Sequence, residues 1–253
     1  MGWPPEVIDS FFAEYLGCDL AAMGPGEVVV AGSSRRYGPE PHHGHVFPLW
    51  LVASGNRCAI SVRKELVWPV QQVTRGTDVE GLTGSAGRAL LAQTVARLLK
   101  VDGRTTTGSG PILYCASGSL RVWDTHPCHP LTSQDMAEAT ASGLYEPYLQ
   151  ASVADGTCYV ALDGFRPVSI SGTWPAAHMA AEIADVCMPG TLETHRRQGY
   201  AKTALSHTTK AILAAGRIPV YITSDRNRAS IATAKSVGYA QYGWEFRVQL
   251  PAD

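Results

Sequence analysis

Apolar and polar residues change period several times along the first half of the chain. Apolar residues recur at helical spacing over residues 4–16 and 88–100, which predicts two helices. Short β-branched or aromatic runs predict strands at 28–32, 48–53, 57–62, 111–115 and 119–123. Because the second and third runs flank a Ser-Gly-Asn turn, we expect them to form a hairpin. The first half is therefore expected to be a mixed α/β domain.

The second half shows a more regular order of elements. Apolar alternation on both sides of Asp163-Gly164 predicts a hairpin of strands 158–162 and 167–174. The pattern then predicts a strand at 181–188, a helix over 201–215, a strand at 218–224, a helix over 228–237 and a last strand at 242–250. Turn residues from His129 onward indicate a boundary near residue 130. We therefore predict two domains, residues 1–130 and 131–253.

A loop of basic and small residues precedes the predicted helix 201–215. The start of a helix leaves backbone N–H groups without partners, and its dipole favours negative charge. Gly199 and Ala201 let an anion approach the backbone, while Arg196 and Arg197 add positive charge. A charge-assisted hydrogen bond contributes about 1.5–3 kcal/mol and the dipole about 0.3–1 kcal/mol, so the N–H groups would dominate. We predict a diphosphate site within residues 191–213.

Composition limits the classes of function. The chain has 253 residues, 45% of them hydrophobic, and a formal net charge of −1, which argues against nonspecific nucleic-acid binding. The sequence contains no run of about 18 uncharged apolar residues, so it predicts no membrane-spanning helix. The first residues lack the charged and apolar regions of a signal peptide, and the six cysteines form no Cys-x-x-Cys pair. We therefore expect a cytoplasmic protein with reduced thiols.

Three other patterns have simpler interpretations than the chemistry they suggest. The glycine-rich residues 81–87 are not preceded by a strand, so a helix entry is favoured over a nucleotide site. Asp124 and His126 lack the Gly-x-Ser-x-Gly nucleophile of a hydrolase. Several further residues lack zinc-finger spacing, so we expect no metal. These residues are His42, His43, His45, His126, Cys128 and His129.

Two motifs in the second half carry a family resemblance. Arg-x-x-Gly-x-Ala occupies residues 196–201, between a predicted strand and a predicted helix, and Asn227, Ser230 and the pair Gly238-Tyr239 follow. Together they resemble the motifs of the GNAT (Gcn5-related N-acetyltransferase) superfamily over about residues 130–250. The resemblance implies a GNAT-type α/β fold with a mixed sheet for residues 131–253, preceded by a smaller mixed α/β domain. The comparable order of elements in residues 1–130 leaves open a degenerate GNAT-like unit there.

The resemblance also implies acetyl-CoA or another acyl-CoA as the donor. It places the backbone N–H groups of residues 197–201 on the diphosphate and the strand edge near residues 190–192 beside the pantetheine. Asn227 and Ser230 would lie beside the pantetheine or the sulfur, although an Asn before a helix is also a normal N-cap. The donor-binding residues expected are Gly190, Thr191, Leu192, Arg196, Arg197, Gln198, Gly199, Tyr200, Ala201, Asn227 and Ser230.

An amine acceptor needs a group that takes its proton, because a lysine-like amine has a pKa of about 10.4. Asp185 lies eleven residues before Arg196, the spacing at which the resemblance implies a carboxylate base. Strand alternation places Asp185 on the same face as Ile183 and Cys187, and it places Glu182 on the other face. An aspartate of pKa about 3.9 is a weak base, so we expect Asp185 to act through water or to orient the amine. Pairing of this carboxylate with an arginine is the alternative.

The expected acid for the leaving thiolate is absent. Many GNAT enzymes have a tyrosine seven residues after the Asn, and Ala234 occupies that position here. Either another hydroxyl group protonates the sulfur, or no acid is needed, because a thiol with a pKa of about 8.5 can leave as thiolate. The hydroxyl groups that could replace the tyrosine belong to Ser230, Tyr200, Tyr221 and Tyr239. The candidate catalytic residues are therefore Asp185, Ser230 and Glu182.

The predicted function is transfer of an acyl group, expected to be acetyl, from CoA to a primary amine of a small molecule. Two alternatives remain open at this stage. The donor can be an acyl carrier protein, as in natural-product biosynthesis, or the chain can be a GNAT that binds acyl-CoA without catalysis.

Overall fold

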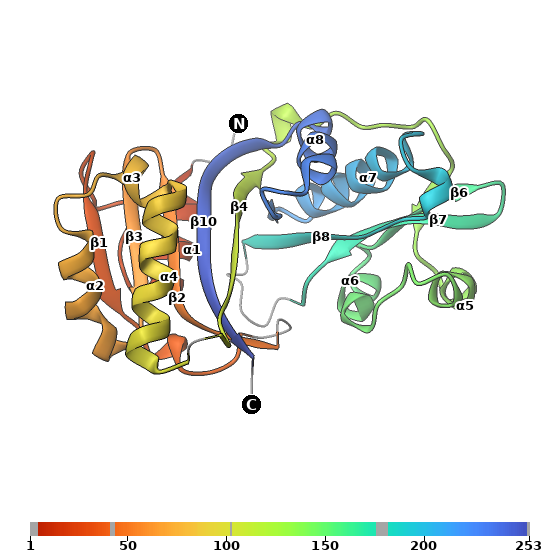
Figure 1. Cartoon of the computed structure of the whole chain (residues 1–253). Helices are drawn as coiled ribbons and strands as arrows, with labels where there is room; N and C mark the ends of the chain where they lie inside the picture. Colours follow the sequence, from red (N-terminus) through yellow and green to blue (C-terminus); the bar gives the residue numbers. More distant parts are fainter. Residues whose placement is uncertain (1–4, 41–43, 102, 176–181, 252–253) are drawn as a thin grey trace. The chain divides into compact units, whose positions relative to one another are not determined.

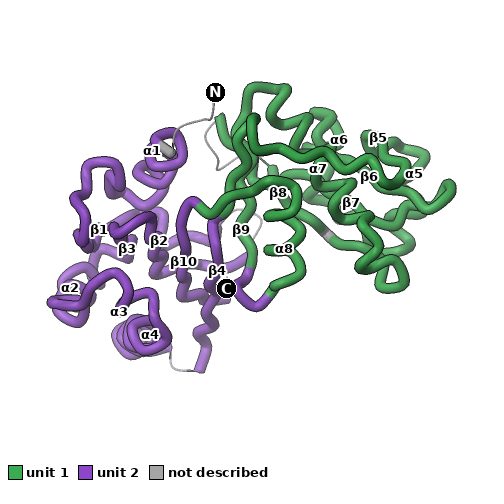
Figure 2. Tube along the Cα trace, turned by 90° about the horizontal axis from the view of Figure 1, so that it is seen from above, with its two compact units in different colours: residues 1–3, 113–223, 227–241 green, residues 4–112, 224–226, 242–253 purple. Residues whose placement is uncertain are grey.

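The computed structural model describes residues 5–40, 44–101, 103–175 and 182–251. Contacts divide the chain into two compact units, coloured purple and green in Figure 2. The N-terminal unit contains residues 4–112, 224–226 and 242–253, and the C-terminal unit contains residues 113–223 and 227–241 together with 1–3. The sequence predicts a boundary near residue 130, whereas this division falls between Ile112 and Leu113.

The N-terminal unit has a sheet with the strand order β1-β3-β2-β10-β4. The strands are β1 (Val28–Gly32), β2 (His45–Ser54), β3 (Arg57–Val62), the first part of β4 (Thr106–Tyr114) and most of β10 (Ala240–Pro251). β1 and β3 are parallel, and β2 is antiparallel to both β3 and β10. The predicted hairpin of β2 and β3 is confirmed, with Ser54 paired to Arg57 at its turn.

Helices cover both faces of this sheet (Figure 1). Inward-facing residues of β2, among them Leu49 and Leu51, form a core with η2 (Lys64–Leu66), α2 (Val67–Thr74), α3 (Val79–Thr83) and α4 (Ser85–Leu99). α1 (Pro5–Leu16) packs on the opposite face, where Tyr15 contacts the ring of Trp50. The short helix η1 (Ser34–Arg36) follows β1.

The glycine-rich residues 81–87 form the junction of α3 and α4. A Cβ at Gly87 would lie 2.2 Å from the backbone oxygen of Gly81, so only glycine permits this approach of the two helices. The sequence interpretation of the segment as a helix entry is confirmed.

The C-terminal unit has a sheet with the order β4-β9-β8-β7-β6-β5. Its strands besides the end of β4 are β5 (Cys128–Pro130), β6 (Tyr159–Asp163), β7 (Arg166–Thr173), β8 (Ile183–Thr191) and β9 (Ile218–Ile222). Neighbouring strands from β5 to β8 are antiparallel, and β9 is parallel to β8. The helical segments are η3 (Ser117–Ser119), α5 (Ser133–Ala141), η4 (Pro147–Leu149), α6 (Gln150–Ala154), η6 (Glu193–His195), α7 (Tyr200–Ala214) and α8 (Arg228–Val237).

Two layers of helices enclose this sheet (Figure 1). Ala184 and Val186 of β8 pack with Leu205 of α7 and Val237 of α8 in one core. On the opposite face, Cys187 packs with residues of α5 and η4. The face of β8 that carries Cys187 is therefore turned away from α7 and α8.

The strand predicted at 119–123 is not present. Residues 117–119 form η3, and the following segment binds to the helices instead of a neighbouring strand. The backbone N–H of Trp123 donates to Ser206 Oγ of α7 at 3.0 Å, and its indole N–H donates to the backbone oxygen of Ser236 of α8 at 3.3 Å. Because these helices satisfy its polar groups, the segment needs no strand partner.

Candidate functional site: an anion-binding loop beside a splayed strand pair

Strands β8 and β9 pair over only part of their length. Parallel pairing runs from Ile183 opposite Ile218 to Asp185 opposite Val220, and then stops. β9 continues to Ile222 and β8 continues to Thr191, so the edge of β8 after Asp185 has no β9 partner. The other edge of β8 remains paired with β7 as far as Thr191, with a register shift between Ile170 and Gly172 of β7.

The end of the loop between β8 and α7, together with the first turn of α7, has backbone N–H groups without hydrogen-bond partners. Within the described residues, the backbone N–H groups from Arg197 to Lys202 have no hydrogen-bond acceptor, and Thr203 is the first whose N–H bonds back, to the backbone oxygen of Gly199 at 3.1 Å. Two residues of the loop have positive φ, Arg197 at 62° and Gly199 at 100°. Free N–H groups at the start of a helix favour an anion, and these lie within the residues for which the sequence predicts a diphosphate site.

His126 braces this loop from a distant part of the chain. Its Nε2 lies 2.8 Å from the backbone oxygen of Gln198, and because a carbonyl only accepts, Nε2 carries the proton. The imidazole stacks on Tyr200 with ring centroids 3.7 Å apart, and Thr125 Oγ1 lies 3.1 Å from Thr203 Oγ1. The segment around His126 therefore holds the loop and the first turn of α7 together.

The side chains around the loop have mixed roles. Arg196 Nε donates to the backbone oxygen of Thr191 at 3.4 Å, and Gln198 Nε2 donates to the backbone oxygen of Thr194 at 2.9 Å. Arg196 and Arg197 are exposed, and Nη1 of Arg196 lies 3.9 Å from Oε1 of Glu193, so an anion would share Arg196 with this carboxylate. The backbone N–H of Leu192 donates to the backbone oxygen of Val168 at 2.9 Å, so this predicted donor-binding residue has its amide already occupied.

The first turn of α8 lies next to Tyr221 of β9. Asn227 is the N-cap of α8, and its Oδ1 accepts from the backbone N–H of Ser230 at 3.1 Å. The capping interpretation of Asn227 is therefore confirmed. The hydroxyl of Ser230 forms a hydrogen bond with Tyr221, which follows directly on Val220, the last β9 residue paired with β8. Burial raises the pKa of Tyr221, and the bond to Ser230 acts in the opposite direction.

The four hydroxyl groups that could replace the absent tyrosine lie in different surroundings. Ala234 is fully buried in the same core as Tyr221. Tyr239 is buried and bonded to Thr209, with 2.8 Å between the hydroxyl oxygens. Tyr200 stacks on His126, and burial together with a hydrogen bond to Asp163 raises its pKa. Tyr221, bonded to Ser230, directly follows the last paired residue of β9 and packs in the core with α7 and α8.

The two carboxylates predicted near the reaction have different surroundings. Asp185 is half-buried at the last paired position of β8, and its charge adds to the effect of burial in raising the pKa of Cys187. Asp185 and Cys187 thus share the face turned away from α7, as strand alternation predicts. Glu182 precedes β8 and is exposed, and its backbone oxygen accepts from the N–H of Ile218 at 2.7 Å.

Residues considered for a metal or a hydrolase site have other partners. His126 binds the loop, and Asp124 Oδ1 lies 2.8 Å from Nε2 of His207 on α7. In the part of the chain that the structure describes, no group of three or more His, Cys, Asp and Glu side chains is arranged to hold a metal ion. His42 and His43 lie outside the described residues. No described helix combines the length and apolarity needed to cross a membrane.

Sequence patterns did not assign His126 and Thr125 to the loop. They stand more than seventy residues before it, and no local spacing links the two segments. A histidine that stacks on an aromatic residue has no periodic signature, so only the tertiary structure shows this contact.

The chain shares its fold with solved structures of low sequence identity. No family model and no curated protein matches the sequence. A Drosophila protein of known structure is 12% identical, with a TM-score of 0.50, over 86% of this chain and 78% of its own. A GNAT acetyltransferase from Colwellia psychrerythraea is 13% identical over 76% of both chains, with a TM-score of 0.49. A GNAT-family acetyltransferase from Novosphingobium aromaticivorans is 17% identical over 60% of this chain and 69% of its own, with a TM-score of 0.45.

These likenesses concern the fold alone. Two of these structures are of GNAT-family acetyltransferases, both with TM-scores below 0.5. Fold similarity at this level of identity does not determine the activity, which depends on the residues of the site.

Proposed function

We propose that this chain is an N-acyltransferase that moves an acyl group, acetyl in the simplest case, from CoA to a primary amine of a small molecule. The observation that carries the proposal is the row of unpartnered backbone N–H groups from Arg197 to Lys202 at the start of α7. Diphosphate oxygens accept hydrogen bonds from such groups, at about 1.5–3 kcal/mol for each charge-assisted bond. The exposed guanidinium groups of Arg196 and Arg197 add attraction.

The pantetheine arm would occupy the free edge of β8. An extended chain with amide groups can pair with an exposed strand edge as another strand would. The amide of Leu192 bonds to β7, and Gly190, two residues earlier and paired with Ile170, directs its backbone groups to the same side, which makes Thr191 the better candidate among the three predicted edge residues. The donor would thereby be led from the diphosphate loop towards the point where β8 and β9 part.

Asp185 and Tyr221 lie at the end of the β8–β9 pairing, on opposite faces of the sheet, and would act on the amine and on the sulfur respectively. The donor would supply a thioester, and nucleophilic attack by the amine releases one proton from nitrogen while the sulfur leaves with the electron pair of its bond. Asp185 would accept the proton through water, since carboxylates are weak bases towards an amine. Tyr221, whose pKa is raised by burial, stays protonated near neutral pH and would donate a hydrogen bond to the sulfur.

A thiol-release assay tests this function. The full chain is incubated with acetyl-CoA and a panel of amino sugars, polyamines and amino acids, and the acetylated product is identified by mass spectrometry. Amine-dependent release of CoA with a matching N-acetyl product supports the proposal. Binding of acetyl-CoA without release for any amine would instead identify a binding protein, and turnover restricted to acylated carrier protein would replace CoA as the donor.

A further inference from the structure

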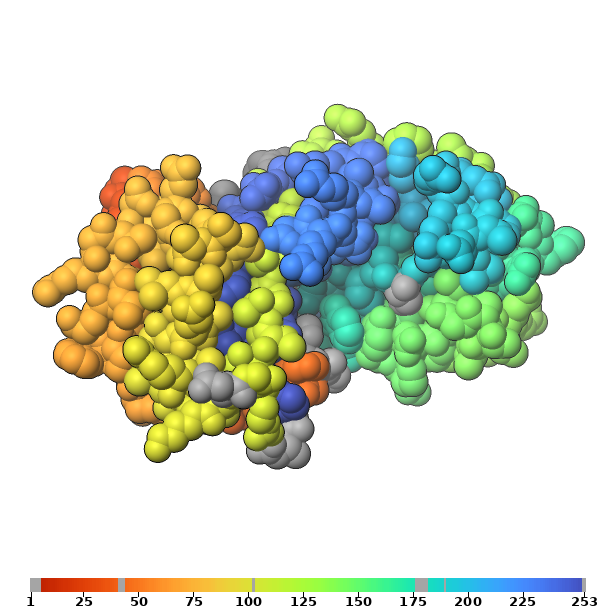
Figure 3. All heavy atoms as spheres, viewed as in Figure 1, coloured from red at the N-terminus to blue at the C-terminus, as the bar shows by residue number. Residues whose placement is uncertain are grey.

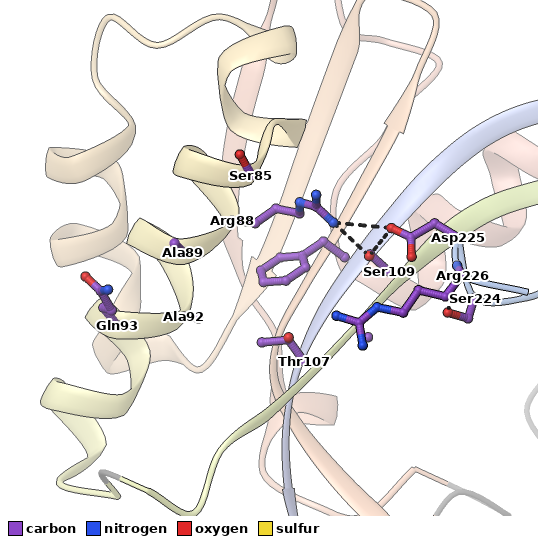
Figure 4. Close-up of a pocket in the computed structure, with 12 residues that line it drawn as sticks. Ser85, Arg88, Ala89, Ala92, Gln93, Thr107, Ser109, Ser224, Asp225 and Arg226 are labelled. Atoms are coloured by element: carbon purple, nitrogen blue, oxygen red, sulfur yellow. Dashed lines mark hydrogen bonds and ion pairs between the residues drawn. The ribbon is translucent and has the colours of Figure 1, made fainter.

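The N-terminal unit contains a cavity. None of the residues of the proposed donor site line it. It has a volume of about 510 Å³ and is lined by α4, by β4, by residues 224–226 and by Phe246 of β10. Figure 4 shows its side chains, and Figure 3 shows α4, coloured yellow, at the molecular surface. This volume falls in the range of small-molecule sites, about 300–1,000 Å³.

One arginine of this cavity is held rigidly. Arg88 Nη1 donates to Ser109 Oγ at 2.9 Å and lies 3.3 Å from Asp225 Oδ2, while Ser109 Oγ donates to the same carboxylate oxygen at 2.6 Å. The guanidinium also lies over the ring of Trp244, 5.3 Å from its centroid. These bonds use one terminal nitrogen of Arg88 and fix the plane of the group, so its other N–H donors keep a set direction.

A second arginine enters the same cavity without a counter-charge. Arg226 is drawn extending from the 224–226 loop towards Thr107 (Figure 4), and its side chain has no acceptor within the described residues. The charged lining groups are Arg88, Arg226 and Asp225, so two positive charges face one negative charge. The remaining lining is mostly polar and includes Gln93 and Thr107, which can bind hydroxyl or amide groups.

We propose that this cavity binds a polar small molecule through a carboxylate placed between Arg88 and Arg226. A single negative charge matches the excess charge of the lining, and the planar guanidinium fork matches the geometry of a carboxylate. This site shares no residue with the proposed donor site and does not depend on it.

The test uses gluconate, a monocarboxylate with several hydroxyl groups, and sorbitol as its uncharged counterpart. In a titration of the full chain followed by NMR, the Nε–H signals of Arg88 and Arg226 should shift and saturate with gluconate but not with sorbitol. Arg226→Gln should weaken gluconate binding about tenfold, the effect of one lost charge-assisted bond. Arg35→Gln is the matched control, because Arg35 is an exposed arginine that does not line the cavity; it pairs with exposed Glu14 and lies over the ring of Tyr15.

A second variant keeps every charge. Ala89 is an exposed residue of α4 that lines the cavity, so Ala89→Trp should fill it without disturbing the core and abolish gluconate binding. Gluconate affinity unchanged in both Arg226→Gln and Ala89→Trp would overturn the site. Tighter binding of inorganic phosphate than of gluconate would overturn the carboxylate assignment.

Discussion

The conformation of Gly199 gives the sharpest test of the diphosphate loop. Gly199 has a φ of 100°, and an alanine there would carry its Cβ 3.3 Å from His126 Nε2 and 3.4 Å from Thr125 Oγ1. A residue with a Cβ in the left-handed region costs about 1–2 kcal/mol, so the loop of Gly199→Ala should relax to another conformation. The N–H groups on either side of residue 199 would then turn away from the anion.

The expected loss of affinity follows from these bonds. Losing one charge-assisted bond of about 1.5–3 kcal/mol weakens acetyl-CoA binding by about tenfold to a hundredfold. Gly216→Ala is the matched control, since Gly216 follows α7 with a φ of 74° and a Cβ added there would have no atom within 4 Å. It should lower the free energy of unfolding by a similar amount, about 1–2 kcal/mol, and leave acetyl-CoA binding intact.

Calorimetry with acetyl-CoA and urea denaturation of both variants separate the two effects. Equal acetyl-CoA affinity in wild type and Gly199→Ala would refute the assignment of this loop. A loss of affinity in Gly216→Ala as large as that in Gly199→Ala would show that strain in α7, and not the loop, controls binding.

The remaining predictions concern proton transfer and stability. Asp185→Asn should lower the amine-dependent rate at least about tenfold with little change in acetyl-CoA affinity, and an unchanged rate would remove Asp185 from the mechanism. Tyr221→Phe should lower kcat, most for acyl donors with poorer leaving thiols, whereas Tyr239→Phe should only reduce stability; equal kinetics in both variants would contradict the role of Tyr221. Burial raises the pKa of Glu245, with Arg247 acting in the opposite direction, so its contribution to stability is present at low pH and lost as pH rises through the folded-state pKa. Urea denaturation should therefore show wild type losing stability relative to Glu245→Gln as pH rises above the ordinary range of a glutamate, and a difference that does not vary with pH would contradict this.

Local sequence patterns predicted most of the elements around the proposed diphosphate loop. The helix α7, the preceding strand and the cap at Asn227 all depend on residues close together in the chain, so periodicity and capping rules identify them. The Arg-x-x-Gly-x-Ala motif predicted the loop because the N–H groups and the glycine that form it are adjacent in sequence.

Features set by distant contacts were not predictable in this way. The segment at residues 119–123 has the alternation of a strand, but α7 and α8 provide partners for its backbone and for Trp123. His126 was weighed as a metal ligand, whereas its neighbour in space is Gln198. β4 and β10 each contribute residues to both compact units, and no change of composition marks the interior of a strand as a boundary.

The central claim is that the backbone N–H groups before α7 bind the diphosphate of an acyl-CoA. Amide NMR spectra of the full chain with acetyl-CoA and with acetyl-pantetheine, which lacks the diphosphate, test it directly. We predict that the amide signals of residues 197–202 shift strongly with acetyl-CoA and little with acetyl-pantetheine. Unchanged signals from these residues at saturating acetyl-CoA would contradict the claim.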